Sequence, residues 1–195
     1  MKTWTLLLAP LSALVLAQTP APPPGPIAMD RPETQAGGRL TVSSPAFGNG
    51  TAIPNRYTRY GDNLSPPLAW TRARGAKVYA LIVDDPDGTL KPVTHWTIWN
   101  MTGTRLPEHL PTDARLATPT GVQGTTTMRG TGFAGPHPPI GDAAHHYHFQ
   151  VFALDAPLLI APAADRETLL VAMKGHVVAR GELVGLYGQP AAPGK

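Results

Sequence analysis

The stretch KVYALIVDDPDG, residues 77–88, gives the clearest indication of how the chain folds. Residues 77–85 form a nearly continuous apolar run, a pattern typical of a strand buried on both faces. The DDPDG segment that follows has the residues that favour a tight turn. We therefore expect a central strand that ends in a turn. Asp85 then lies at the mouth of that strand, where its carboxylate can orient a histidine or contact a ligand.

Further strands are expected on both sides of this one. HWTIWNM (95–101) is rich in β-branched and aromatic residues, and HYHFQVFAL (146–154) is another strong strand pattern. RLTVSS (39–44) alternates between apolar and polar residues. Asp165 is a candidate N-cap for a helix over RETLLVAMKGH (166–176), and 177–187 can form a second short helix or a last strand. The pattern predicts a mainly β, antiparallel domain with a short helical C-terminal end.

Composition excludes several classes of protein. The chain has 195 residues, 42% hydrophobic residues and a net charge of +3 with only 15% charged residues. This charge is too weak to indicate a nucleic-acid partner. The chain has no cysteine, which excludes disulfides, thiolate zinc sites and a lipoprotein anchor.

The N-terminal residues are typical of an export signal. Residues 1–17 combine a positive start at Lys2, a short apolar stretch and a small residue, Ala17, at the expected cleavage site. The alternative is an uncleaved anchor; no later segment is apolar enough to cross a membrane. Residues 18–38 are Pro-rich and predict an extended tether outside the core. We therefore expect a signal (1–17), a tether (18–38), a domain (39–189) and a tail (190–195), in a secreted or periplasmic protein.

Three histidines, His145, His146 and His148, begin the last strong strand. Alternation along a strand places His145 and Tyr147 on one face and His146 and His148 on the other, so the three imidazoles cannot share one ion. His146 and His148 could bind a metal only with further ligands, and no acidic residue follows them closely on the strand. We expect no metal and no cofactor.

Other polar residues are expected to gather near the ends of these strands. A hairpin between Asp85 and His95 brings their side chains to the same end of the sheet, where the carboxylate can fix the imidazole tautomer. The alternative for His95, beside Trp96, is a buried core histidine. GTGFAGPHPPIG (130–141) is a stiff Gly- and Pro-rich loop whose backbone can approach an anion, and it lacks the lysine of a nucleotide-binding P-loop.

An ordered set of motifs resembles the phosphatidylethanolamine-binding protein family, and most closely its bacterial, Raf kinase inhibitor-like branch. The motifs cover most of residues 41–188 and are NLSPPLAW (63–70), DDPDG (84–88), HWTIWN (95–100), GPHPPIG (135–141), HHYHFQVFALD (145–155) and AMKGHVVARGELVGLYG (172–188). The resemblance implies a large antiparallel sheet packed with a smaller one, plus short C-terminal helices. It also implies a pocket for small anions, including phosphate and the phosphate of phospholipid head groups.

The same resemblance implies which residues form the pocket. They are Asp85, Asp87, His95, His145 and Tyr147, with Pro138 and Pro139 in the wall. At the position before the two prolines, where animal members often have glycine, this chain has His137, which either adds a cationic contact or partly fills the pocket.

We therefore expect a binding module and not an enzyme. Its partner is a small anionic ligand or a phospholipid head group, which is bound best at mildly acidic pH because only imidazolium donates from both nitrogens. One alternative is a hydrolase in which Asp85 and His95 act as acid and base, although no convincing nucleophile is apparent. The other is an inhibitor that binds a protease or kinase through surface loops.

Overall fold

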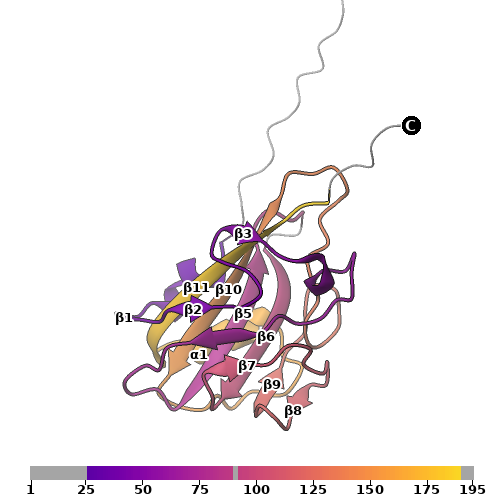
Figure 1. Cartoon of the computed structure of the whole chain (residues 1–195). Helices are drawn as coiled ribbons and strands as arrows, with labels where there is room; N and C mark the ends of the chain where they lie inside the picture. The colour runs from indigo at the N-terminus through magenta and orange to yellow at the C-terminus, as the bar shows by residue number, and fades with distance from the viewer. Residues whose placement is uncertain (1–25, 90–91, 190–195) are drawn as a thin grey trace, which may run out of the picture.

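The structure is a computed structural model that describes residues 26–89 and 92–189 of the chain (Figure 1). The predicted signal, the first part of the predicted tether and the predicted tail lie outside the described residues. In the part of the chain that the structure describes, no helix has the length and apolar character needed to span a membrane.

The three strongest strand predictions form the centre of the larger sheet. Strands β5 (Val78–Asp85), β6 (Val93–Met101) and β10 (His145–Leu154) lie where the sequence indicates. β5 pairs antiparallel with both of the others, so that Phe149 lies opposite Val83, and Val83 lies opposite Trp96. Every residue of β5 is buried, as the continuous apolar run predicts.

The larger sheet is mainly antiparallel, as predicted, but two parallel pairings make it mixed. Among the described residues it has eight strands in the order β1-β11-β10-β5-β6-β9-β8, with β3 also paired to β11. Its short strands are β1 (Gly38–Arg39), β3 (Thr51–Ala52), β8 (Arg115–Leu116) and β9 (Gly121–Gln123). Both β1 and β3 run parallel to β11, and a pairing between segments so far apart leaves no local signal.

A smaller sheet and a helix cover the two faces of the larger sheet. The smaller sheet has the order β2-β4-β7 and consists of β2 (Val42–Ser43), β4 (Leu68–Trp70) and β7 (Arg105–Leu106). One core contains Leu81 and Val83 of β5 with residues of this sheet, and the other contains Ala80 and Ile82 with residues of the helix. Burial on both faces explains why β5 has no alternating polar residues.

The C-terminal part has one helix, where the sequence predicted short helices. Helix α1 (Arg166–Met173) begins after Asp165, whose side chain accepts a hydrogen bond from the backbone N–H of Thr168 at 2.8 Å, as the predicted N-cap requires. The next segment forms strand β11 (Val177–Tyr187) and not a second helix. It pairs along its length with β10, and its buried positions alternate, as is typical of a strand.

The tether prediction is wrong for its described part, residues 26–38. The short 3-10 helices η1 (Ala28–Asp30) and η2 (Pro32–Thr34) lie here, and Gly38 already belongs to β1. Ala28 and Thr34 are fully buried, and Ile27 is nearly so. Its proline content predicted an extended segment, but its few apolar residues pack against the core between the sheet and α1, called the second core below.

Buried hydrogen bonds hold this segment to the sheet. The backbone N–H of Ala28 donates to Oδ2 of Asp84 at 2.9 Å, and Arg166 of α1 donates to the same carboxylate from Nε and Nη2 at 3.0 Å. The side chain of Gln150 also donates to Asp84 Oδ2. Asp84 therefore ties the N-terminal segment, the helix and two strands together on the face opposite Asp85.

Candidate functional site

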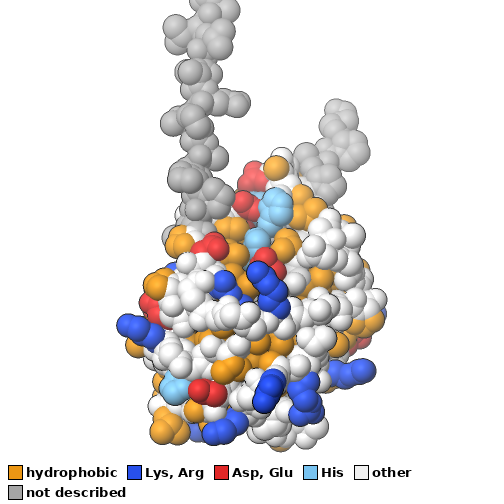
Figure 2. All heavy atoms as spheres, turned by 90° about the vertical axis from the view of Figure 1, so that its left-hand side faces the viewer, with side chains coloured by type: hydrophobic (Ala, Val, Ile, Leu, Met, Phe, Trp, Pro, Cys, Tyr) orange, Lys and Arg blue, Asp and Glu red, His pale blue; other side chains and the backbone are white. Residues whose placement is uncertain are grey.

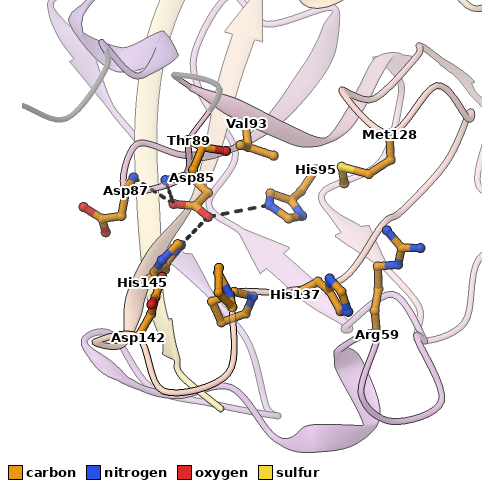
Figure 3. A pocket seen from close by; sticks show the side chains of 13 residues that line it. Arg59, Asp85, Asp87, Thr89, Val93, His95, Met128, His137, Asp142 and His145 are labelled. Atoms are coloured by element: carbon orange, nitrogen blue, oxygen red, sulfur yellow. Dashed lines mark hydrogen bonds and ion pairs between the residues drawn. The ribbon is translucent and has the colours of Figure 1, made fainter. Parts of the chain in front are cut away.

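The predicted site residues meet where three central strands end. His145 is the first residue of β10, Asp85 is the last residue of β5, and His95 lies near the start of β6. Because these strands are antiparallel neighbours, all three side chains lie at the same end of the sheet. Figure 3 shows both imidazoles directed toward the Asp85 carboxylate.

The turn after β5 fixes the carboxylate of Asp85. The backbone N–H groups of Asp87 and Gly88 donate to Oδ1 at 2.8 and 3.1 Å. A Cβ at residue 88 would lie 2.5 Å from the side chain of Val93, so only glycine fits this close approach. The tight-turn and functional interpretations of DDPDG are therefore compatible, because the turn holds the Asp85 carboxylate beside His145.

The two imidazoles keep this carboxylate ionised. His145 Nδ1 lies 2.8 Å from Asp85 Oδ2, and His95 Nε2 lies 3.9 Å from the same oxygen. Burial by itself would raise the pKa of Asp85, but the side chains of His95 and His145 and the backbone N–H of Asp87 outweigh it and hold the pKa below its usual value. Asp85 therefore orients histidine, as expected from the sequence.

The tautomers of both imidazoles follow from their partners. Nδ1 of His95 lies 2.6 Å from the carbonyl oxygen of Ala134, which can only accept, so Nδ1 carries the proton. Nδ1 of His145 donates to Asp85 in the same way. His95 is buried, and its Nε2 has no hydrogen-bond partner among the described residues. A bound ligand could provide that partner.

Tyr147 supports the two imidazoles from beneath. Its ring packs edge-on to His95 at 5.1 Å and parallel to His145 at 6.4 Å between ring centres. Its hydroxyl is buried without a hydrogen-bond partner among the described residues. Burial, and next the charge of Asp85, raise the pKa of this hydroxyl, so that it stays protonated and can act as a donor.

A cavity of about 230 Å³, called the site pocket below, opens over these residues. Asp85, His95 and His145 line it, together with Asp87, His137, Pro138 and Pro139, as the family resemblance implies. Tyr147 is not among its lining residues, but its buried ring packs against His95 and His145, which are. The sequence thus identified a set of residues that the fold brings together at one end of the sheet.

His137 lines the pocket without filling it. Its imidazole stacks on Tyr60, with ring centres 4.6 Å apart, and remains exposed. The Tyr60 hydroxyl donates to the carbonyl oxygen of Pro138 at 2.7 Å, which fixes the proline wall. His137 therefore lies at the rim of the pocket, stacked on Tyr60.

Sequence reasoning missed six lining residues. These are Arg59, Gly88, Thr89, Val93, Met128 and Asp142. In Figure 3 the acidic residues Asp87 and Asp142 lie at one end of the pocket, and Arg59 lies at the other. Arg59 precedes β4 in a loop, and no local pattern connects that loop to the strand ends. Its permanent charge is the most important of the missed features.

His146 and His148 lie on the opposite face from His145, as alternation predicts. Nδ1 of His146 lies 2.8 Å from Asp87 Oδ2, and Nδ1 of His148 lies 3.0 Å from Glu182 Oε2. Figure 2 shows histidine and acidic side chains gathered at the upper end of one face of the molecule. Among the described residues no three His, Asp or Glu side chains form a group suited to a metal ion.

Comparisons with known proteins agree with this fold. A family model described as phosphatidylethanolamine-binding protein matches residues 43–188. A UPF0098 protein of Pyrococcus horikoshii is 44% identical over 151 residues, which are 76% of this chain and 76% of the relative. A UPF0098 protein of Mycobacterium tuberculosis is 36% identical over 169 residues, 86% of this chain and 79% of the relative.

Two solved structures are similar to this one. A phosphatidylethanolamine-binding protein homologue of Chlamydia trachomatis, CT736, has a TM-score of 0.70 and 34% identity, and the match covers 78% of this chain and 99% of that chain. YbcL of Escherichia coli, described as a new member of the mammalian PEBP family, has a TM-score of 0.69 and 27% identity. That match covers 77% of this chain and 99% of YbcL.

Proposed function

Since this chain belongs to the phosphatidylethanolamine-binding protein family, we propose that it is an exported ligand-binding protein whose site pocket takes a small phosphate-like or carboxylate anion. A phospholipid head group is one source of such an anion. In this proposal the protein has no catalytic role and needs no metal or cofactor.

One observation carries the proposal. His95 Nε2 and the Tyr147 hydroxyl are buried polar atoms without a partner among the described residues, and both lie at or just below the site pocket. Buried polar groups in native proteins nearly always have hydrogen-bond partners, and exceptions often mark functional sites. The group that completes this site is therefore expected to be a polar ligand.

The charges around the pocket favour an anion as that ligand. Arg59 provides a permanent charge, and His95, His137 and His145 provide donors when they are protonated. Asp85 does not repel the anion strongly, because its oxygens already accept from the turn and from His145. In His95 and His145 the Nδ1 proton is already donated to a protein oxygen. Nε2 can therefore donate only from imidazolium, and binding is expected to strengthen as pH falls.

The contacts of Asp85 favour binding over hydrolysis. A general base needs a free lone pair facing the substrate, whereas this carboxylate faces its own imidazole and turn. Turnover of ester or phosphoester substrates would identify a hydrolase instead. Capture of a protein partner that persists after mutation of the pocket would identify an inhibitor.

Calorimetric titration with inorganic phosphate, sulfate and methylphosphonate tests the proposal. His145→Ala should weaken binding by about tenfold to over a hundredfold, because a hydrogen bond to a charged group is lost. Sulfate and methylphosphonate separate the titration of the protein from that of phosphate.

His146→Ala should weaken binding little, since its imidazole lies on the other face. His148→Ala is the cleaner control, because His148 pairs with Glu182, whereas His146 touches Asp87 in the pocket wall. Equal losses for His145→Ala and His148→Ala, or none for either, would mean that the histidines are structural.

Export is tested separately by N-terminal sequencing of the mature protein. We expect it to begin near Gln18, because signals are cleaved after small residues such as Ala17. Intact Met1 in the soluble protein would contradict this part of the proposal.

A further inference from the structure

A second hollow of about 190 Å³, called the side pocket below, adjoins the site pocket. The two share Arg59 and Met128 as lining residues. Ala134 lines the side pocket, and its carbonyl oxygen accepts the Nδ1 proton of His95 at 2.6 Å. The two hollows are therefore neighbours that share one arginine.

The lining of the side pocket differs in charge from that of the site pocket. Asp85, Asp87 and Asp142 line the site pocket, whereas no acidic residue is among the described residues that line the side pocket. Arg59 is exposed, and within the described ranges no carboxylate forms a salt bridge with it. In Figure 3 its guanidinium lies at the end of the site pocket away from Asp87.

Two further side chains of the side pocket can donate hydrogen bonds. Asn63 has φ +56°, and its Oδ1 accepts a hydrogen bond from the backbone N–H of Gly135 at 2.8 Å. The donor of the Asn63 amide is therefore Nδ2. Thr126 is only 7% exposed, and its hydroxyl has no partner among the described residues. A guanidinium, an amide N–H₂ and a hydroxyl without a nearby acid form a donor set that suits an acceptor-rich, negative group.

We propose that the side pocket is a second anion subsite, and that the ligand carries a phosphate or phosphonate group joined by a short linker to a carboxylate. This inference rests on the proposed function, because the phosphate group occupies the site pocket. The carboxylate lies beyond Arg59, near Asn63 and Thr126, and Arg59 contacts both groups.

The test is a pair of matched ligand series at one pH and salt concentration. One series is methyl-, ethyl-, propyl- and butylphosphonate; the other replaces the terminal methyl group by a carboxylate, as in phosphonoacetate, 3-phosphonopropionate and 4-phosphonobutyrate. Calorimetry should show that the carboxylate tightens binding by about tenfold at one preferred length, since one charge-assisted hydrogen bond is worth that much. The alkyl series should show no such optimum.

Two variants test whether residues of the side pocket cause the tighter binding of the carboxylate series. Asn63→Asp keeps the Oδ1 acceptor for Gly135 and tolerates a positive φ, but it removes the amide donor and adds a negative charge. It should abolish the tenfold gain while methylphosphonate binds within about twofold of its original affinity. Thr126→Val removes the unpartnered hydroxyl and should reduce the gain by about two- to tenfold, without loss of thermal stability.

Thr97→Val is the matched control for Thr126→Val. Like Thr126, Thr97 is a buried threonine without a hydroxyl partner among the described residues, and it lines neither pocket. Its substitution should leave both ligand series unchanged. Equal binding of the two series, or equal effects of Thr97→Val and Thr126→Val, would overturn the subsite while the site pocket stands. If methylphosphonate and every other phosphonate fail to bind, the proposed function falls and the subsite with it.

Discussion

Asp84 and Asp85 are adjacent in the sequence and have different tasks, because alternation along β5 directs them to opposite faces of the sheet. Asp85 accepts from the turn and from His145 at the site pocket. Asp84 accepts from Arg166 and from the N-terminal segment in the second core. Two identical neighbouring side chains thus differ in role only through the strand geometry.

The ionised state of Asp85 predicts how stability changes in acid. Its native pKa is lowered, so its contribution to stability is complete above the unfolded value of 3.8 and is lost as pH falls through the native value. Asp85→Asn should lower the free energy of unfolding at neutral pH by roughly 1.5–3 kcal/mol. Below about pH 4 the unfolding curves of the wild type and the variant should converge.

Urea unfolding across about pH 2 to 7 measures this convergence. Asp113→Asn, at an exposed position, is the control and should run parallel to the wild type. A constant difference between the wild type and Asp85→Asn at every pH would mean that the charge of Asp85 does not stabilise the fold.

The unpartnered hydroxyl of Tyr147 gives a second prediction at this scale. Tyr147→Phe should not lower thermal stability, because the hydroxyl has no hydrogen bond among the described residues to lose. It should weaken phosphate binding by about three- to tenfold if the ligand supplies the missing acceptor. Unchanged binding in calorimetry would mean that Tyr147 is part of the core and only supports the imidazoles.

Single residues were predictable where a local pattern determined them. Alternation separated His145 from His146, and the DDPDG turn placed Asp85 at the end of a strand. Arg59 could not be found in this way, because it reaches the site from a loop that is distant in sequence from the strand ends at Asp85, His95 and His145. His137 was identified by resemblance, but only the stacking on Tyr60 showed that it leaves the pocket open.

At the scale of elements, the long strands and the helix were predictable and the edges of the sheet were not. A continuous apolar run fixes β5 because both of its faces are buried, and the Asp165 cap fixes the start of α1. The two-residue strands β1 and β3 exist only because β11 provides a partner. A short strand whose pairing depends on a distant partner has no hydrophobic periodicity in its own residues.

Arg166 connects helix α1 to the sheet and gives a prediction for the elements. Removing one partner of a buried ion pair leaves the other uncompensated, so Arg166→Leu should lower the free energy of unfolding by about 3–5 kcal/mol. Arg31→Gln breaks an exposed pair with Glu167 and should cost less than about 1 kcal/mol. Chemical denaturation compares the two variants, and equal losses would contradict the role assigned to Asp84.

For the whole molecule, the main revision concerns where the folded unit begins. Proline content predicted a tether up to residue 38, yet the described part of this segment, from residue 26, packs on the sheet. Composition reports average behaviour, whereas burial of Ile27, Ala28 and Thr34 depends on a complementary surface around Asp84 and α1. The core between the sheet and helix α1 is thus closed by the N-terminal segment.

Two truncated chains test this boundary. A chain that starts at residue 26 keeps every contact described here, whereas one that starts at residue 38 exposes the second core and removes the Ala28 donor from Asp84. The shorter chain should lose roughly 3–6 kcal/mol from apolar burial and a charged hydrogen bond, and its Tm should fall by on the order of 10 °C. Its phosphate affinity below that Tm should stay within about twofold, because none of the residues that line the site pocket lies in the removed segment. Equal Tm values for the two chains would mean that the segment adds nothing to the fold.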